Sequence, residues 1–70
     1  MATEVKAEMA GNIWKIEVRE GAQIVAGDVI LIMESMKMEI PVEAPKAGVC
    51  RLRVAAEQAV QEGEVLALIE

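Results

Sequence analysis

The chain repeats its own residue pattern after about half its length, and this repeat limits the possible folds more than any other feature. At an offset of 37 residues, Val5 recurs as Val42 and Gly11 as Gly48. At an offset of 36 the matching pairs are Val18 and Val54, Ile24 and Val60, Gly27 and Gly63, Asp28 and Glu64, Val29 and Val65, Ile32 and Leu68, and Glu34 and Glu70. Two copies are too few for a solenoid, so we expect two halves related by approximate two-fold symmetry.

Alternation of apolar and charged residues predicts β-strands in both halves. Over 3–9, Val5, Ala7 and Met9 alternate with charged residues, which is the period of a strand with one buried face. Alternation or short apolar runs predict the next strands over 13–19, 23–25, 29–33, 40–42 and 49–54. The repeat places two more within 55–70. The expected fold is all-β, a flattened eight-stranded barrel or sandwich with quasi-two-fold symmetry.

Residues 55–63 carry conflicting signals. Their alanine, glutamate and glutamine content favours a helix. The equivalent stretch of the first half contains Glu20 and Gly21, which fit poorly in a helix. Because the repeat is the stronger indication, we expect a loop and a short strand here.

Pro41 and Trp14 bear on where their strands lie. Pro41 has no N–H group to donate, so its strand is expected at the edge of a sheet, or to end there. Trp14 is the only aromatic residue and breaks the alternation of its strand. Its position is compatible both with covering a barrel end and with partial exposure.

Composition bounds the function. Seventy residues fit one small domain over 1–70. Histidine, tyrosine and phenylalanine are absent, which argues against triad and metal-assisted chemistry, so we expect no catalytic residue and no metal site. The net charge of −5 argues against nucleic acid, and no apolar run is long enough to span a membrane.

The single cysteine, Cys50, is expected to be a small buried hydrophobic residue. One cysteine cannot form an internal disulfide, so nothing indicates secretion. The first residues also lack the apolar core of a signal peptide. A cytoplasmic location is therefore expected.

The two copies are joined by residues 35–39, which have no counterpart after Glu70. Lys37 lies at the centre of this connector. Its neighbours on each side are a methionine and, further out, a glutamate, namely Met36, Met38, Glu34 and Glu39. By symmetry, the chain termini take the equivalent place in the second half. We therefore expect Lys37 on a hairpin tip at one end of the domain and both termini at the other.

The segment Glu34-Ser35-Met36-Lys37-Met38-Glu39 resembles the Ala-Met-Lys-Met biotin attachment motif of biotinyl carrier domains, the biotin carboxyl carrier family. Further segments are placed as in that family, namely Val42-Glu43-Ala44-Pro45 followed by Gly48-Val49, and Gly63-Glu64-Val65-Leu66. The resemblance covers essentially the whole chain and is greatest to the short single-domain biotin/lipoyl attachment proteins. It implies the flattened eight-stranded barrel that the repeat predicts independently.

The resemblance also implies roles for the motif residues. Lys37 would accept covalent biotin, with Met36 and Met38 beside the cofactor. The residues implied in ligase recognition are Glu34, Ser35 and Glu39. Ser35 stands where the family usually has alanine, and because both side chains are small we expect modification to survive. No inserted "thumb" of the kind found in some bacterial acetyl-CoA carboxylase carriers is present in the sequence.

The family's chemistry implies partners rather than catalysis. A biotin protein ligase would attach the cofactor, a biotin carboxylase would carboxylate it, and a carboxyltransferase would receive the carboxyl group. The domain itself would be a non-catalytic, monomeric carrier, whose swinging arm raises the effective concentration of the cofactor at both sites.

Two alternatives stay open at this point. A lipoyl domain shares the fold but usually shows Asp-Lys-Ala around its lysine, so we expect mainly biotin, with lipoyl as a minor modification. The second alternative is an unmodified barrel that serves only as an interaction module, in which Lys37 would have no role.

Overall fold

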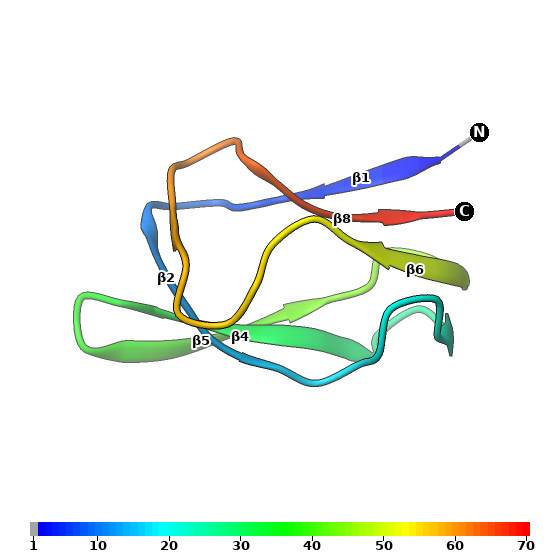
Figure 1. Ribbon diagram of the computed structural model, residues 1–70, viewed down its shortest axis with the longest axis horizontal. Helices are drawn as coiled ribbons and strands as arrows, with labels where there is room; N and C mark the ends of the chain where they lie inside the picture. The colour runs from blue at the N-terminus through cyan, green and yellow to red at the C-terminus, as the bar shows by residue number, and fades with distance from the viewer. Residues whose placement is uncertain (1) are drawn as a thin grey trace.

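The computed structural model describes residues 2–70, which form eight β-strands and no helix (Figure 1). The strands are β1 (Thr3–Lys6), β2 (Gly11–Ile16), β3 (Gln23–Ile24), β4 (Val29–Ser35), β5 (Met38–Glu43), β6 (Gly48–Leu52), β7 (Ala59–Val60) and β8 (Val65–Ile69). They make two four-stranded sheets, in the orders β1-β8-β6-β3 and β5-β4-β2-β7. The prediction of an eight-stranded all-β fold is confirmed.

The two sheets are related by the symmetry that the repeat predicts. Replacing β1, β2, β3 and β4 by β5, β6, β7 and β8, and the reverse, converts the order of one sheet into that of the other. Individual hydrogen bonds follow the same rule. The Gly27 N–H donates to the Ala44 carbonyl over 2.9 Å, and the equivalent Gly63 N–H donates to the Ala7 carbonyl over 2.8 Å. The quasi-two-fold symmetry is therefore present in the backbone pairing itself.

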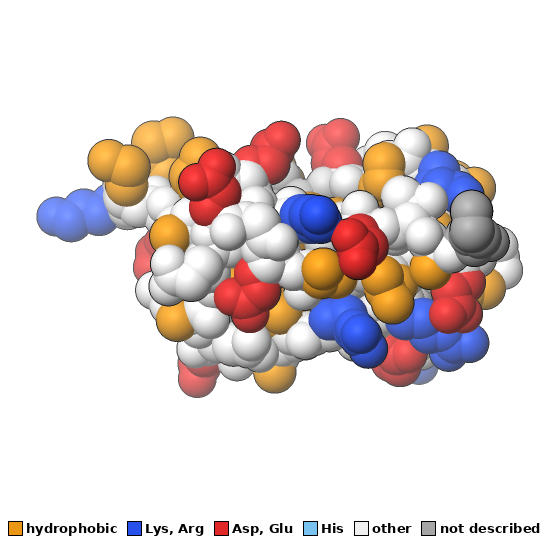
Figure 2. Space-filling model, turned by 90° about the horizontal axis from the view of Figure 1, so that it is seen from above, with side chains coloured by type: hydrophobic (Ala, Val, Ile, Leu, Met, Phe, Trp, Pro, Cys, Tyr) orange, Lys and Arg blue, Asp and Glu red, His pale blue; other side chains and the backbone are white. Residues whose placement is uncertain are grey.

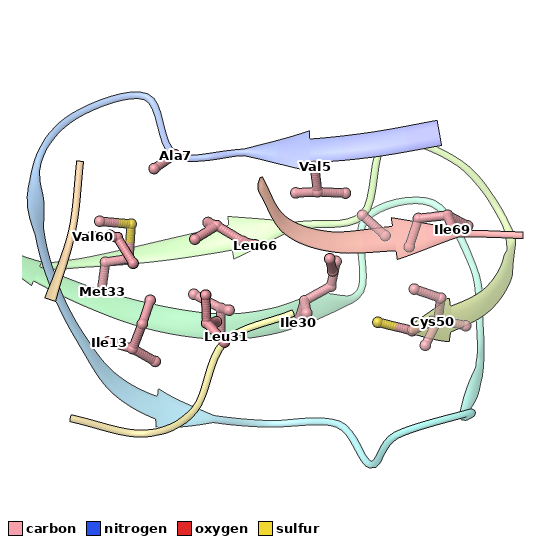
Figure 3. Packing of buried hydrophobic residues seen from close by; sticks show 14 residues of the cluster. Val5, Ala7, Ile13, Ile30, Leu31, Met33, Cys50, Val60, Leu66 and Ile69 are labelled. Carbon is pink, nitrogen blue, oxygen red and sulfur yellow. The ribbon is translucent and has the colours of Figure 1, made fainter. Parts of the chain in front are cut away.

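The core lies between the two sheets and is built from both repeats. Side chains of Val5 and Leu66 from one sheet and of Ile13 and Leu31 from the other point toward one another (Figure 3). The last three of these are fully buried. Neither half contains enough apolar surface to close such a core alone, and burying it against the other half is the main stabilising contribution.

Two strands end earlier than the alternation predicts. β1 stops at Lys6 rather than reaching Met9, and β2 covers 11–16 rather than 13–19. Met9, expected on the buried face, is 41% exposed. The partner strand β8 begins at Val65, opposite Lys6, so β1 has no strand to pair with beyond that residue. Ala7 is still buried, but the chain bends at residues 8–9 and leaves Met9 exposed.

The connector between the repeats is shorter than predicted. β4 continues to Ser35 and β5 begins at Met38, so only two residues lie outside the strands rather than 35–39. Cross-strand pairing extends through Glu34 with Glu39 and Ser35 with Met38. The two strands thus pair to the last residue before the turn.

Residues 55–63 form a loop and the short strand β7, as the repeat predicts. The helix that their composition favours is not formed. Glu57 has φ 68° and takes the place equivalent to Gly21, which has φ 80°. The left-handed conformation is therefore kept in the second copy although the glycine is not.

Pro41 lies on β5, which is an edge strand as predicted. Trp14 on β2 is 47% exposed, with the Lys15 Nζ 5.9 Å from its ring centroid, so of the two positions that the sequence left open, partial exposure is the observed one.

Within residues 2–70 there is no helix with the length and apolar character needed to cross a bilayer.

The two ends of the long axis differ in character. The β4–β5 hairpin projects at one end, while β1 and β8 start and finish at the other (Figure 1). Thr3 pairs directly with Ile69 there. The predicted layout, with the lysine hairpin opposite the termini, is confirmed over a molecule 31 Å long.

Candidate functional site

The β4–β5 hairpin turns in two residues, Met36 and Lys37. Ser35 pairs with Met38 across the strands, directly below the turn. Met36 has φ 53° and Lys37 has φ 64°. Two consecutive positive φ values are typical of a type I′ turn, whose twist matches that of the flanking strands. The lysine therefore occupies a defined position at the tip rather than a loose loop.

This turn contains neither of the residues that such a turn favours. Type I′ turns prefer Asn-Gly or Asp-Gly, because other side chains are strained in the left-handed region. A left-handed conformation costs an ordinary residue about 1–2 kcal/mol. Strain kept at a site often accompanies function. The presence of Met36 and Lys37 in this turn therefore indicates that their side chains have a functional role, since they do not favour the stability of the turn.

The hairpin is fastened to the body of the domain at its root. Ser35 is 9% exposed, and its hydroxyl donates a hydrogen bond to the Ala10 carbonyl over 2.8 Å. On the same side, a Cβ at Gly11 would lie 2.6 Å from the Glu34 carbonyl oxygen and 3.1 Å from the Ser35 Cβ. Glycine is needed at that position for β2 to approach β4 so closely.

Beyond this root, the side chains at the tip face solvent. Met36 is 89% exposed and Met38 is 62% exposed, and Lys37 is also exposed. Figure 2 shows the hairpin end as a projecting basic side chain with hydrophobic side chains beside it. Exposed methionines offer flexible, polarisable contact surface. The hairpin tip therefore offers a surface that another protein can bind.

Charge at the hairpin root is negative. Glu34 and Glu39 face each other across the strands, and both are exposed. Like charges directly opposite in a sheet are mildly destabilising. Among residues 2–70, the ion pairs involve other lysines and arginines, so Lys37 is not held by a carboxylate. Its ammonium group is free to meet a partner.

No second cluster of reactive groups accompanies this lysine. In the part of the chain that the structure describes, no three His, Cys, Asp or Glu side chains are placed to hold a metal ion. Cys50 is fully buried, as predicted for a small hydrophobic residue. Burial raises the pKa of its thiol, and the nearby Glu20 carboxylate adds to the rise. A thiol of this kind is unreactive.

The hairpin brings together all six residues of the predicted motif, from Glu34 to Glu39. Ser35 differs from the others, because it is buried and anchors the hairpin instead of facing a partner. Sequence reasoning missed the two residues on which it rests, Ala10 and Gly11. The repeat contained a signal for Gly11, since glycine recurs at the equivalent Gly48, where an added Cβ would also lie 2.6 Å from a carbonyl oxygen, that of Glu70.

Comparison with known protein families agrees with this geometry. Residues 1–69 match the family model described as "Biotin-requiring enzyme". The chain belongs to the biotin/lipoyl attachment family. The resemblance seen in the motif is thus confirmed over nearly the full length of this attachment domain.

Relatives of the attachment domain include proteins of the same size. The biotinylated protein TB7.3 homolog of Mycobacterium leprae is 44% identical over 70 residues, which cover 99% of either chain. The biotin/lipoyl attachment protein of Bacillus subtilis is 44% identical over 63 residues, 89% of this chain and 86% of the relative. Longer proteins match as well. The biotin-dependent acyl-coenzyme A carboxylase alpha3 subunit of Mycobacterium leprae is 43% identical over 94% of this chain but only 11% of its own length.

Solved structures match the attachment domain closely. Urea carboxylase of Kluyveromyces lactis superposes on all of this chain with a TM-score of 0.93 and 31% identity, over 6% of its own length. A single-chain, multi-domain long-chain acyl-CoA carboxylase superposes on 97% of this chain with a TM-score of 0.87 and 28% identity, over 7% of its length. The fold therefore occurs both as a small protein and within large carboxylases.

Proposed function

We propose that this chain is a biotin carboxyl carrier in which Lys37 is the residue that receives biotin. The observation that carries the proposal is the exposed Lys37 at a strained two-residue turn, between two exposed methionines. Relatives whose names describe them as biotinylated support the choice of cofactor.

The residues of the hairpin fit such a group. Lysine side chains are charged and weakly nucleophilic at neutral pH, so an amine needs an activated acyl donor. We infer that a ligase supplies biotinyl-adenylate. The lysine ammonium group first gives up its charge-carrying proton, and the free amine then attacks the biotin carboxyl carbon. The bond from that carbon to AMP breaks, AMP leaves, and the nitrogen releases a second proton as the amide forms. The formal net charge moves from −5 to −6.

The hairpin residues have two different roles, contact with the ligase and attachment of the hairpin to the sheet. Met36 and Met38 present apolar surface to the ligase, and Glu34 and Glu39 add negative charge beside it. Ser35 holds the turn at a fixed distance from the sheet through its bond to Ala10. A lysine presented in one place, on a rigid pair of strands, binds a ligase without the cost of ordering a loop.

When bound, biotin carries a carboxyl group between two enzymes. We infer that the partners are a biotin carboxylase and a carboxyltransferase, with the chain acting as one domain over 1–70 and contributing no catalytic residue of its own. The carboxylases among its relatives and structural neighbours support this inference. The tether contributes effective concentration, because the cofactor stays with the complex.

Intact-mass measurement after co-expression with a biotin protein ligase tests the assignment. We expect one biotin adduct on the wild-type chain and none on Lys37→Arg, which keeps the charge. Lys46→Arg is the matched control, because Lys46 is also an exposed lysine between strands, and it should be labelled like wild type.

Other results would assign the chain differently. A lipoyl adduct without biotin, in cells that hold both ligases, would make it a lipoyl carrier, the alternative that the name of the Bacillus subtilis relative includes. A chain that stays unmodified would be an interaction module. Equal labelling of Lys37→Arg and wild type would refute Lys37 as the acceptor.

A further inference from the structure

A groove of about 430 Å³ runs between β1 and β5, away from the lysine at the hairpin tip. Its apolar lining includes Val5 of β1 and Val42 of β5, which are equivalent positions of the two repeats. Met33 and Ile40 continue that lining toward the hairpin. The groove therefore follows from the symmetry of the fold, because the edge strand of one sheet lies opposite the edge strand of the other.

The strands that border the groove are the first members of their sheets. β1 pairs only with β8, and β5 only with β4, within residues 2–70. Each therefore has one side with backbone groups that no strand satisfies. An extended peptide is the partner that such an edge accepts most readily, through main-chain hydrogen bonds and alternate side-chain pockets. Pro41 removes one donor from the β5 edge, which leaves β1 as the better edge for pairing.

The rim of the groove is acidic. Glu4, Glu8 and Glu43 line it, against a single lysine, Lys6. Lys6 is already paired with Glu4, at 3.4 Å between Nζ and Oε1. Among the described residues, Glu8 and Glu43 take part in no ion pair. Two free carboxylates beside an apolar floor complement a segment that carries basic and apolar side chains.

The groove also continues into the hairpin. Met33 and Ile40 pair with each other across β4 and β5, three to four residues from the tip. Met9, which is 41% exposed, lines the groove as well. A segment bound here would therefore lie beside the strands that carry Lys37.

We infer that this groove is a docking site for an extended segment of a partner protein in which lysine or arginine alternates with apolar residues. The apolar side chains lie on the floor formed by Val5 and Val42. The basic side chains meet Glu8 and Glu43. This inference does not depend on the modification of Lys37, so it is tested on the unmodified chain.

The test is an NMR titration of the ¹⁵N-labelled, unmodified chain with an acetylated octapeptide of alternating lysine and valine. We expect saturable amide shifts confined to residues 3–9 and 39–46, and none with the octapeptide of alternating glutamate and valine. Raising the salt concentration should weaken binding, because partly exposed charges are screened. In Glu8→Gln/Glu43→Gln the affinity should fall at least fivefold.

Glu17→Gln/Glu57→Gln is the matched control. It has the same net charge as the groove variant, and neither of its positions lines the groove. Its affinity should stay within twofold of wild type. Equal loss of affinity in the two double variants, shifts spread over the whole acidic surface, or shifts that do not saturate would each overturn the inference. Because all four glutamates lie on the surface, a well-dispersed spectrum is expected from both variants and is checked first.

Discussion

The Ser35 hydroxyl donates a hydrogen bond to the Ala10 carbonyl over 2.8 Å, and this contact joins the end of β4 to the turn before β2. It is the one side-chain bond that ties the lysine hairpin to the rest of the described chain. Ser35 is thus a support for the site, while its neighbours Met36 and Lys37 form the surface.

Ser35→Ala should lower the free energy of unfolding by about 1 kcal/mol, the usual contribution of one such hydrogen bond. Ser35→Cys keeps the shape of the side chain with a slightly larger atom, but its thiol donates weakly, so the free energy of unfolding should fall by a similar amount. Urea denaturation measures both. Because neither substitution changes the turn residues Met36 and Lys37, the rate of biotinylation by a ligase should stay within about threefold of the wild-type rate. An unchanged denaturation midpoint in Ser35→Ala would show that the bond contributes nothing.

Met36→Gly should make the domain more stable and a poorer ligase substrate. Relief of left-handed strain, about 1–2 kcal/mol, exceeds the extra entropy loss of glycine, about 0.5–1 kcal/mol, so a gain of about 0.5 kcal/mol is expected. Little apolar burial is lost, since Met36 is 89% exposed. Initial biotinylation rates should fall at least tenfold.

Met36→Leu is the control for that prediction, because it keeps the apolar surface and the strain. It should match wild type in both stability and biotinylation. Faster labelling of Met36→Gly than of wild type would mean that the turn side chain hinders the ligase, contrary to the role given to it here.

Glu57→Gly should stabilise the domain at a position outside the lysine hairpin. Its φ of 68° is close to the 80° that Gly21 adopts without strain at the equivalent position. A gain of about 0.5 kcal/mol is expected for the same reasons as at Met36. Glu57→Ala removes the same carboxylate without relieving φ and should bring no gain. Equal gains in the two variants would trace the effect to charge and not to backbone strain.

Cys50 should make stability fall at alkaline pH. Burial raises the pKa of its thiol above the ordinary value of 9.0. The unfolded thiol then ionises first, so this contribution is complete below about pH 9 and is lost as pH rises toward the folded-state pKa. The slope is at most about 1.4 kcal/mol per pH unit. Denaturation midpoints across this range should fall more steeply for wild type than for Cys50→Ala, and parallel curves would contradict the assignment.

Much of the fold could be predicted from the repeat, because symmetry relates whole strands and is insensitive to local propensity. It placed β7 within 55–63 where composition favoured a helix. Strand ends were harder. Alternation continues to Met9 in the sequence, but β1 ends at Lys6, because its partner strand β8 begins opposite that residue. Where a strand ends thus depends on the neighbouring strand, which a linear pattern does not contain.

The position of the lysine hairpin could be predicted from the sequence, but only part of its geometry could. Lys37 could be placed at the tip, since the connector has no repeat equivalent. Its type I′ turn could not, because Met-Lys lacks the usual Asn-Gly signal. The contacts of Ser35 and the acidic groove between β1 and β5 arise from residues far apart in the sequence, and only the folded sheets bring them together.

Tryptic mapping of the wild-type chain, isolated after co-expression with a biotin protein ligase, shows which lysine carries the cofactor. Trypsin does not cleave after an acylated lysine. We expect a peptide of residues 20–46 that carries one biotin on Lys37. Unmodified peptides 20–37 and 38–46, with biotin on another lysine or on none, would contradict it.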